Sequence, residues 1–178
     1  MSERIDELFE AMASSALDHA ERDELTELLE AQGDWGRLTR LYEQLAGQAD
    51  SEETALQWYR KAADVAETEG ADLEKAVELL GNTLSGSDGE ILSTLVRMRS
   101  LLETLGHWEN WIEVAENEVL FQTDTAQAVA LYILMGSNAA THLKDNARAL
   151  DYFQEAFERD GSCVEALQKA REIYLVQE

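Results

Sequence analysis

The residues best suited to metal or thiol chemistry in this 178-residue chain are three histidines and a single cysteine. A metal site would need His, Cys or carboxylate side chains at ligand spacing, and the sequence has no His-x-x-x-His or Cys-x-x-Cys pair. His19, His107 and His142 fall near the ends of different expected helices, and Cys163 has no neighbouring base to activate its thiol. We therefore expect no metal, no cofactor and no catalytic residue, and we expect Cys163 to fill an apolar gap.

Carboxylates and tryptophans are the other groups that could form a site. With 37 acidic residues, adjacent pairs such as Glu52-Glu53 are unavoidable. General acid–base catalysis needs paired carboxyl groups in a dry pocket, whereas these pairs fall on the polar faces of expected helices. The tryptophans fall on apolar stripes, which favours core packing over a ligand-binding box: Trp35, Trp58, Trp108 and Trp111.

The formal net charge of −23 is spread along the chain. Such a charge disfavours direct binding to nucleic acid or to an anionic membrane, and favours a protein partner with basic residues. The acidic segment Met1–Glu7 lacks the apolar core of a secretory signal, and the longest apolar run, Ala128–Met135, is too short to span a bilayer. One cysteine permits a reducing compartment, so the expected location is the cytoplasm.

Proline is absent, and the ten glycines mostly end helical patterns, so we expect an almost entirely helical chain. Ten helices follow from the spacing of apolar residues. The first covers about Glu3–His19 and the second about Asp23–Gln32, and Asp160 is expected to open the last. The connections are short, so consecutive helices should pack antiparallel.

An internal repeat organises these helices. The segment Leu101–Trp108 (LLETLGHW) repeats Leu28–Trp35 (LLEAQGDW), 73 residues earlier, and in both an apolar helical run stops at a glycine and restarts at a tryptophan. The alignment continues to Leu84 without a gap. A one-residue slip then aligns Asp88-Gly89 with Asp160-Gly161. Self-similarity at a fixed period is typical of repeat architectures.

Most of the chain resembles the tetratricopeptide repeat (TPR) family, and one segment shows the pattern most clearly. In Leu143–Asp160, the residues Ala149, Phe153 and Ala156 match the small–aromatic–small pattern of the second helix of that repeat. Gly136 matches the small residue that lets the two helices of a unit approach closely. The two-unit period of 73 residues is similar to that of long bacterial proteins of this family.

The resemblance implies an all-α, right-handed helical-hairpin solenoid of about ten antiparallel helices. It also implies a single TPR-like domain over residues 1–178. That domain would consist of an N-terminal helix, four repeat units and a C-terminal helix: 1–20, 21–50, 51–87, 88–123, 124–160 and 161–178.

In the resembled family, the first helix of each unit lines a concave face that binds a partner. Carried onto this chain, that face would be acidic in its N-terminal half and more apolar in its C-terminal half. The expected partner-binding residues are Gln57, Arg60, Asp64, Glu67, Val96, Ser100, Glu103, Ile133, Ser137 and Thr141. The resemblance thus implies a non-enzymatic adaptor or assembly scaffold that binds a protein or peptide in its groove.

Two other classes of function stay open. An acidic inhibitor or immunity-type protein would use the charge to mask a basic surface of an enzyme or nucleic-acid-binding protein. An enzyme would need a closed ring of helix pairs. The last expected helix, which ends at Tyr174–Glu178, also has an apolar stripe that no later helix covers. Since terminal repeats normally have a polar outer face, we expect self-association, a partner at this end, or a longer repeat array.

Overall fold

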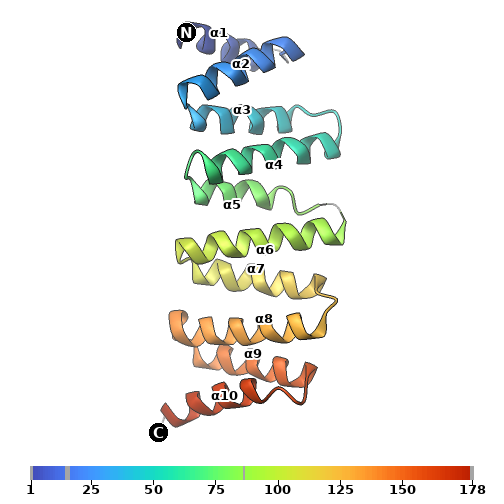
Figure 1. The fold of residues 1–178 in the computed structure, drawn as a ribbon, viewed down its shortest axis with the longest axis vertical. Coiled ribbons are helices and arrows are strands. Elements are labelled where there is room, and N and C mark those ends of the chain that lie inside the picture. The colour runs from blue at the N-terminus through green and yellow to red at the C-terminus, as the bar shows by residue number, and fades with distance from the viewer. Residues whose placement is uncertain (1, 15–16, 86, 177–178) are drawn as a thin grey trace. The chain divides into compact units, whose positions relative to one another are not determined.

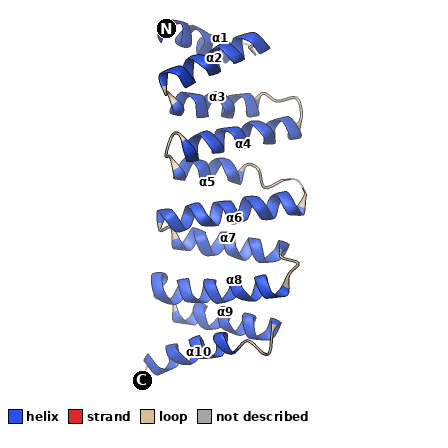
Figure 2. Cartoon of the chain, viewed as in Figure 1, coloured by secondary structure: helices blue, strands red, loops and turns tan. Residues whose placement is uncertain are grey.

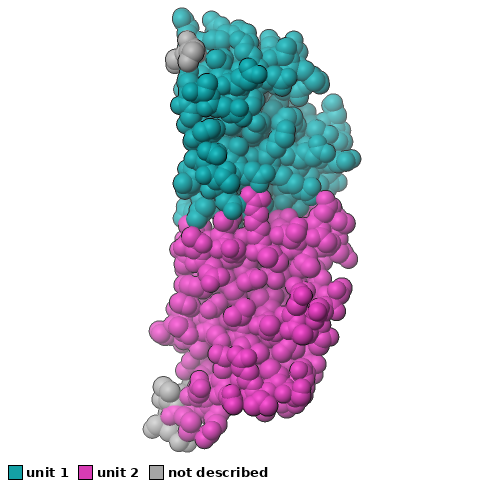
Figure 3. Space-filling model, in the orientation of Figure 1, with its two compact units in different colours: residues 1–83 teal, residues 84–178 magenta. Residues whose placement is uncertain are grey.

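The computed structural model describes residues 2–14, 17–85 and 87–176, which form ten α-helices, one π-helix and no strand (Figures 1 and 2). This confirms the all-α prediction. The chain divides into two compact units, residues 1–83 (unit 1) and 84–178 (unit 2), which Figure 3 colours teal and magenta. None of the helices in the described residues is long and apolar enough to cross a membrane.

Unit 1 consists of five helices, each of which contacts the next one along the chain (Figure 1). Their apolar faces meet in a core that includes Leu25, Leu29, Leu38 and Leu41, all 1% exposed or less. The helices are α1 (Ser2–Ser14), α2 (His19–Gln32), α3 (Trp35–Gly47), α4 (Glu52–Thr68) and α5 (Leu73–Gly81).

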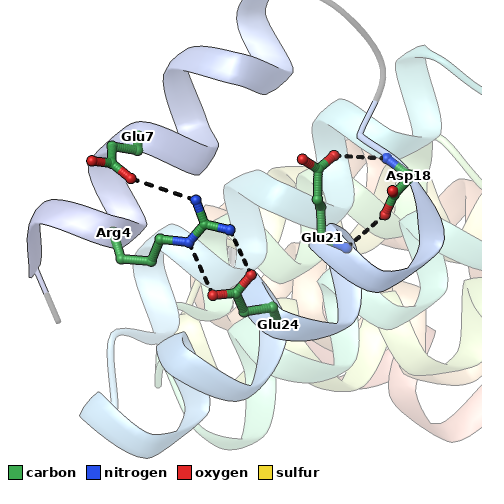
Figure 4. Close-up of polar contacts among 5 residues, drawn as sticks. All are labelled: Arg4, Glu7, Asp18, Glu21 and Glu24. Carbon is green, nitrogen blue, oxygen red and sulfur yellow. Dashed lines mark hydrogen bonds and ion pairs between the residues drawn. The ribbon is translucent and has the colours of Figure 1, made fainter.

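The expected first helix over residues 3–19 is wrong at its C-terminal end, because Leu17 and Asp18 are not helical; α1 is described to Ser14, and residues 15–16 lie outside the described part. Asp18 instead begins the next helix. Its carboxylate accepts a hydrogen bond from the Glu21 N–H at 2.8 Å, and its own N–H donates to the Glu21 carboxylate at 3.0 Å (Figure 4). This capping box places the start of α2 at His19, four residues before the expected Asp23.

Unit 2 again consists of helices that contact their chain neighbours, and α10 also contacts α8. The π-helix η1 directly extends α8. The elements are α6 (Asp88–Leu105), α7 (Trp108–Phe121), α8 (Thr125–Asn138), η1 (Ala139–Leu143), α9 (Asn146–Arg159) and α10 (Val164–Val176).

The prediction that Asp160 opens the last helix is wrong. Its carboxylate accepts hydrogen bonds from the Ser162 N–H at 2.9 Å and from the Ser162 hydroxyl at 2.6 Å, which closes a turn after α9. These bonds, both to Oδ1, lower the pKa of Asp160. The last helix, α10, consequently begins at Val164.

The repeated glycine–tryptophan turn has the same backbone in both units. Gly33 (φ 64°) and Gly106 (φ 71°) are left-handed, a conformation that glycine adopts without steric cost. The N–H groups of Asp34 and His107 then donate to the carbonyls of Leu29 and Leu102, both at 3.0 Å. The turns therefore close α2 and α6 in the same way.

A second pair of positions 73 residues apart also matches. Ala71 (φ 49°) and Lys144 (φ 58°) are both left-handed. Asp72 donates from its N–H to the Ala66 carbonyl at 2.8 Å, and Asp145 donates to the Ala139 carbonyl at 3.0 Å. The carboxylates of Asp72 and Asp145 then cap α5 and α9. The sequence period is thus also present in the hydrogen bonds of each unit.

Two helices of unit 2 approach closely where Gly136 of α8 faces Phe153 of α9. A Cβ atom at Gly136 would lie 2.6 Å from Phe153 Cε1, and Phe153 is only 3% exposed. This agrees with the expected small residue at position 136, and the distance shows that even a Cβ atom would crowd the Phe153 ring. Any larger residue there would push α9 away from α8.

We predict that Gly136→Ala lowers the free energy of unfolding by about 1–3 kcal/mol, because the added methyl overpacks the buried Phe153 ring. Urea unfolding followed by circular dichroism measures the change. The matched control is Gly89→Ala in α6, where an added Cβ meets nothing within 4 Å. Gly89→Ala should leave the free energy of unfolding unchanged or raise it by up to about 1 kcal/mol, because alanine has a better helix propensity than glycine. Equal stability of the two variants would contradict the close approach.

Candidate functional site

The expected partner-binding residues of unit 1 lie on one face of α4. Gln57 and Asp64 are exposed, whereas Arg60 and Glu67 are half-buried. They do not line the unit 1 cleft of about 390 Å³, which lies between α3, α4 and α5 and is bordered by residues such as Lys75. Their role in binding stays a prediction.

The expected residues of unit 2 divide into two groups. Val96, Ser100 and Glu103 are exposed on α6, and α6 does not contact α8. Ile133 of α8, expected as an apolar contact for a partner, is only 8% exposed, so its own unit covers most of it. Its neighbour Leu134 is 46% exposed. Because α8 is apolar on most sides, periodicity could not show which of its residues face solvent.

Ser137 and Thr141 come together at a cleft of about 240 Å³, which we call the unit 2 cleft. Its floor contains two buried apolar side chains, Phe153 and Ile173. Its rim carries hydroxyl, amide, ammonium and carboxylate groups from four elements. The lining residues are Ser137, Ala140, Thr141, Asn146, Phe153, Lys169, Glu172 and Ile173.

The π-helix η1 positions one wall of the unit 2 cleft, because it carries Ala140 and Thr141. The His142 ring stacks on the Trp108 indole of α7, with ring centroids 3.7 Å apart and planes inclined by 8°. This stack attaches the π-helix to the start of α7. Lys144 then ends the π-helix in a left-handed conformation, which places Asn146 at the start of α9.

A polar network holds α9, which supplies the floor residue Phe153, against α7. Arg148 donates from Nε to the Tyr152 hydroxyl at 2.8 Å and pairs with Glu109 of α7. The Tyr152 hydroxyl donates to the Glu116 carboxylate. Burial, together with this hydrogen bond to a carboxylate, raises the pKa of Tyr152 to about 12. Two helices are thus joined by a network in which Tyr152 is buried, Arg148 is half-buried and the two carboxylates are exposed.

The rim charges of the unit 2 cleft come from α10. Lys169 and Glu172 lie one turn apart, and within the described residues neither is paired with another side chain. An unpaired cation and an unpaired anion beside an apolar floor can hold a segment with one apolar side chain between polar groups. Among the described residues, no three His, Cys, Asp or Glu side chains converge as metal ligands do.

Sequence reasoning found Ser137 and Thr141 but missed Asn146, Lys169 and Glu172. Those three lie on α9 and α10, outside the first helices that the resemblance placed on a binding face. Their polarity is ordinary for the surface of a helix. Only the packing of α10 against α9 and α8 brings them to the cleft.

We predict that Tyr152→Phe removes a titration step with a midpoint of about pH 12 from the 295 nm absorbance of the folded protein. The raised pKa favours the neutral phenol in the folded state. The stability it contributes is therefore complete below the unfolded-state pKa of about 10 and is lost as the pH rises towards 12. Stability should thus fall more steeply in this range in the parent chain than in the variant.

The matched control for this titration is Tyr174→Phe, because Tyr174 is 59% exposed on α10. The control should leave the step at about pH 12 in place. If Tyr152→Phe removes instead a step near pH 10, the Tyr152 hydroxyl is not buried against Glu116 as described.

The structure is thus that of an all-helical protein of antiparallel hairpins with a polar-rimmed cleft in unit 2. No known protein family matches the chain. No curated protein matches it significantly.

Several solved structures resemble the chain. MamA has a TM-score of 0.47 and 12% identity, covering 86% of this chain and 84% of MamA. YrrB, described as a TPR protein with an unusual peptide-binding site, has a TM-score of 0.43 and 17% identity, with coverages of 96% and 83%. BtubC (BKLC) from P. vanneervenii has a TM-score of 0.43 and 17% identity, with coverages of 97% and 84%.

Proposed function

We propose that this chain is a non-enzymatic interaction module, an adaptor or assembly scaffold, that binds a segment of another protein in the unit 2 cleft. One observation carries the proposal: Ser137 and Thr141, expected on a binding face, line a cleft with an apolar floor and unpaired rim charges. Binding, and no covalent step, is the activity that such an arrangement supports.

The chemistry of the unit 2 cleft indicates what the bound segment carries. Phe153 and Ile173 form the apolar floor, which suits one apolar side chain of the partner. Lys169 can donate to a carbonyl or carboxylate oxygen of the segment, and Glu172 can pair with a basic residue. The net charge of −23 would raise the rate of association with a basic partner.

A second candidate is the acidic inhibitor, which the net charge favours. Such a protein would act through many exposed carboxylates and not through one cleft. Its affinity for the basic partner would fall steeply as the salt concentration rises, and would depend little on any single residue. The cytoplasmic location rests on the sequence and stays a prediction.

The C-terminal helix supports contact with another polypeptide at the end of unit 2. Val164, Leu167, Tyr174 and Leu175 of α10 are each more than half exposed. Self-association through this helix is one form of such contact, and binding of a different protein is the other.

Selection of peptides from a random phage-displayed library, with the full chain as bait, tests the unit 2 cleft. We predict that the selected peptides pair an apolar residue with a nearby Lys or Arg. Glu172→Lys should weaken their binding about tenfold or more, because attraction at the rim becomes repulsion.

Glu165→Lys is the matched control, since it makes the same change on α10 at an exposed position outside the unit 2 cleft. It should leave the affinity nearly unchanged. Selected peptides that bind Glu172→Lys and Lys169→Glu as well as the parent chain would overturn the cleft proposal. If Glu165→Lys and Glu172→Lys lose the same amount of affinity, and the loss depends on salt, the result would favour the acidic-inhibitor function.

A further inference from the structure

One face of α10 is apolar and exposed. Val164 is 61% exposed, Leu167 51%, Tyr174 59% and Leu175 58%; we call these four residues the α10 stripe. The stripe borders a cleft of about 430 Å³ between α9 and α10, which Leu167 and Tyr174 help to line. Within unit 2, α10 contacts only α9 and α8, so no described helix of the unit covers the stripe.

The internal repeat shows which helix of unit 2 corresponds to α10. After the one-residue slip, α10 aligns with α6 at an offset of 72 residues. Apolar and basic residues coincide along both helices. The aligned pairs are Leu95 with Leu167, Arg99 with Arg171, Leu101 with Ile173, and Leu102 with Tyr174.

The exposed fractions of aligned residues in α6 and α10 differ on one side of the helices only. Leu101 and Ile173 are similarly buried, at 7% and 8% exposure. By contrast, Leu95 is 2% exposed where Leu167 is 51%, and Leu102 is 2% exposed where Tyr174 is 59%. The side of α10 that carries Leu167 and Tyr174, in the middle of the α10 stripe, is therefore the side that is covered in α6.

The helix of unit 2 that covers α6 is α7. Arg99 of α6 pairs with Glu118 of α7 at 2.6 Å, and Glu118 is only 3% exposed. The Arg99 guanidinium also lies 5.4 Å from the ring centroid of Trp111, which is 1% exposed. An aromatic ring and a carboxylate, seven residues apart on one face of α7, thus hold the arginine that corresponds to Arg171.

We propose that the α10 stripe docks an amphipathic helix of a partner protein, with an aromatic residue and an acidic residue seven positions later facing Arg171. Between the aromatic and the acidic residue, the partner helix carries apolar residues that cover the α10 stripe. They correspond to Ile112 and Ala115, which lie on the buried face of α7. The acidic residue is required because an arginine enclosed by apolar groups without a carboxylate is costly. Arg171 therefore selects the partner.

The same arginine disfavours a second copy of this chain as the occupant. Antiparallel pairing of two α10 stripes about a two-fold axis would place the middle of each stripe against the middle of the other. Arg171 lies near that middle, between Leu167 and Tyr174. Two like charges would then meet in an apolar contact.

The probe for this site is a synthetic peptide with the sequence of residues 107–122, which contains α7, titrated into the full chain by calorimetry. We expect saturable one-to-one binding with a dissociation constant in the micromolar range. Arg171→Glu should weaken binding about tenfold or more. A peptide with Glu118→Lys should bind the parent chain poorly and bind the Arg171→Glu chain again, because the charges are exchanged together.

Lys169→Glu is the control on the same helix, since it changes the unit 2 cleft and leaves the α10 stripe intact. It should not alter binding of the α7 peptide. Likewise, Arg171→Glu should not alter binding of peptides selected for the cleft, so the two proposals can fail separately.

Three outcomes would overturn the α10 proposal. The first is no saturable binding of the α7 peptide to the parent chain. The second is undiminished binding to Tyr174→Asp, which would place the peptide elsewhere. The third is a dimer of the chain alone, seen by light scattering and abolished by Tyr174→Asp, which would make a second copy the occupant.

Discussion

Each amphipathic helix of this chain needs a neighbouring helix to cover its apolar face, and the structure of both units depends on this requirement. Within each unit, most contacts join helices that follow one another; among the described residues of unit 2, α7 also contacts η1 and α8 also contacts α10. Gly136 shows how closely two such helices can approach, because no side chain separates α8 from the Phe153 ring. A helix covered on one side only has an apolar surface available for another polypeptide.

Local chemistry made much of the fold predictable. The glycine–tryptophan turns at Gly33 and Gly106 depend on a left-handed residue, and the starts of α5 and α9 depend on aspartate caps. Such features are determined within a few residues, so a repeat of the sequence repeats them. For the same reason, the 73-residue period survives in the backbone hydrogen bonds of the two units.

Errors arose where one residue type serves two purposes. Asp18 is a helix cap in a stretch that the apolar pattern extended, whereas Asp160 resembles a cap but closes a turn with Ser162. The π-helix at Ala139–Leu143 has no distinctive composition and was not foreseen. Asn146, Lys169 and Glu172 reach the unit 2 cleft only through packing. The pattern could not show that Ile133 is buried, because α8 is apolar on most sides. Single-sequence periodicity contains no information on these contacts.

The succession of contacts between chain neighbours also determines how each unit would respond to mechanical force. Within the described residues, a unit pulled at its two ends has no contact between its first and last helices to resist extension. Its helices would detach one after another at low force, and each detachment would lengthen the chain by one helix and its connection. Such a unit stretches gradually and recovers quickly, because every helix re-forms contacts with a segment that is close in the sequence.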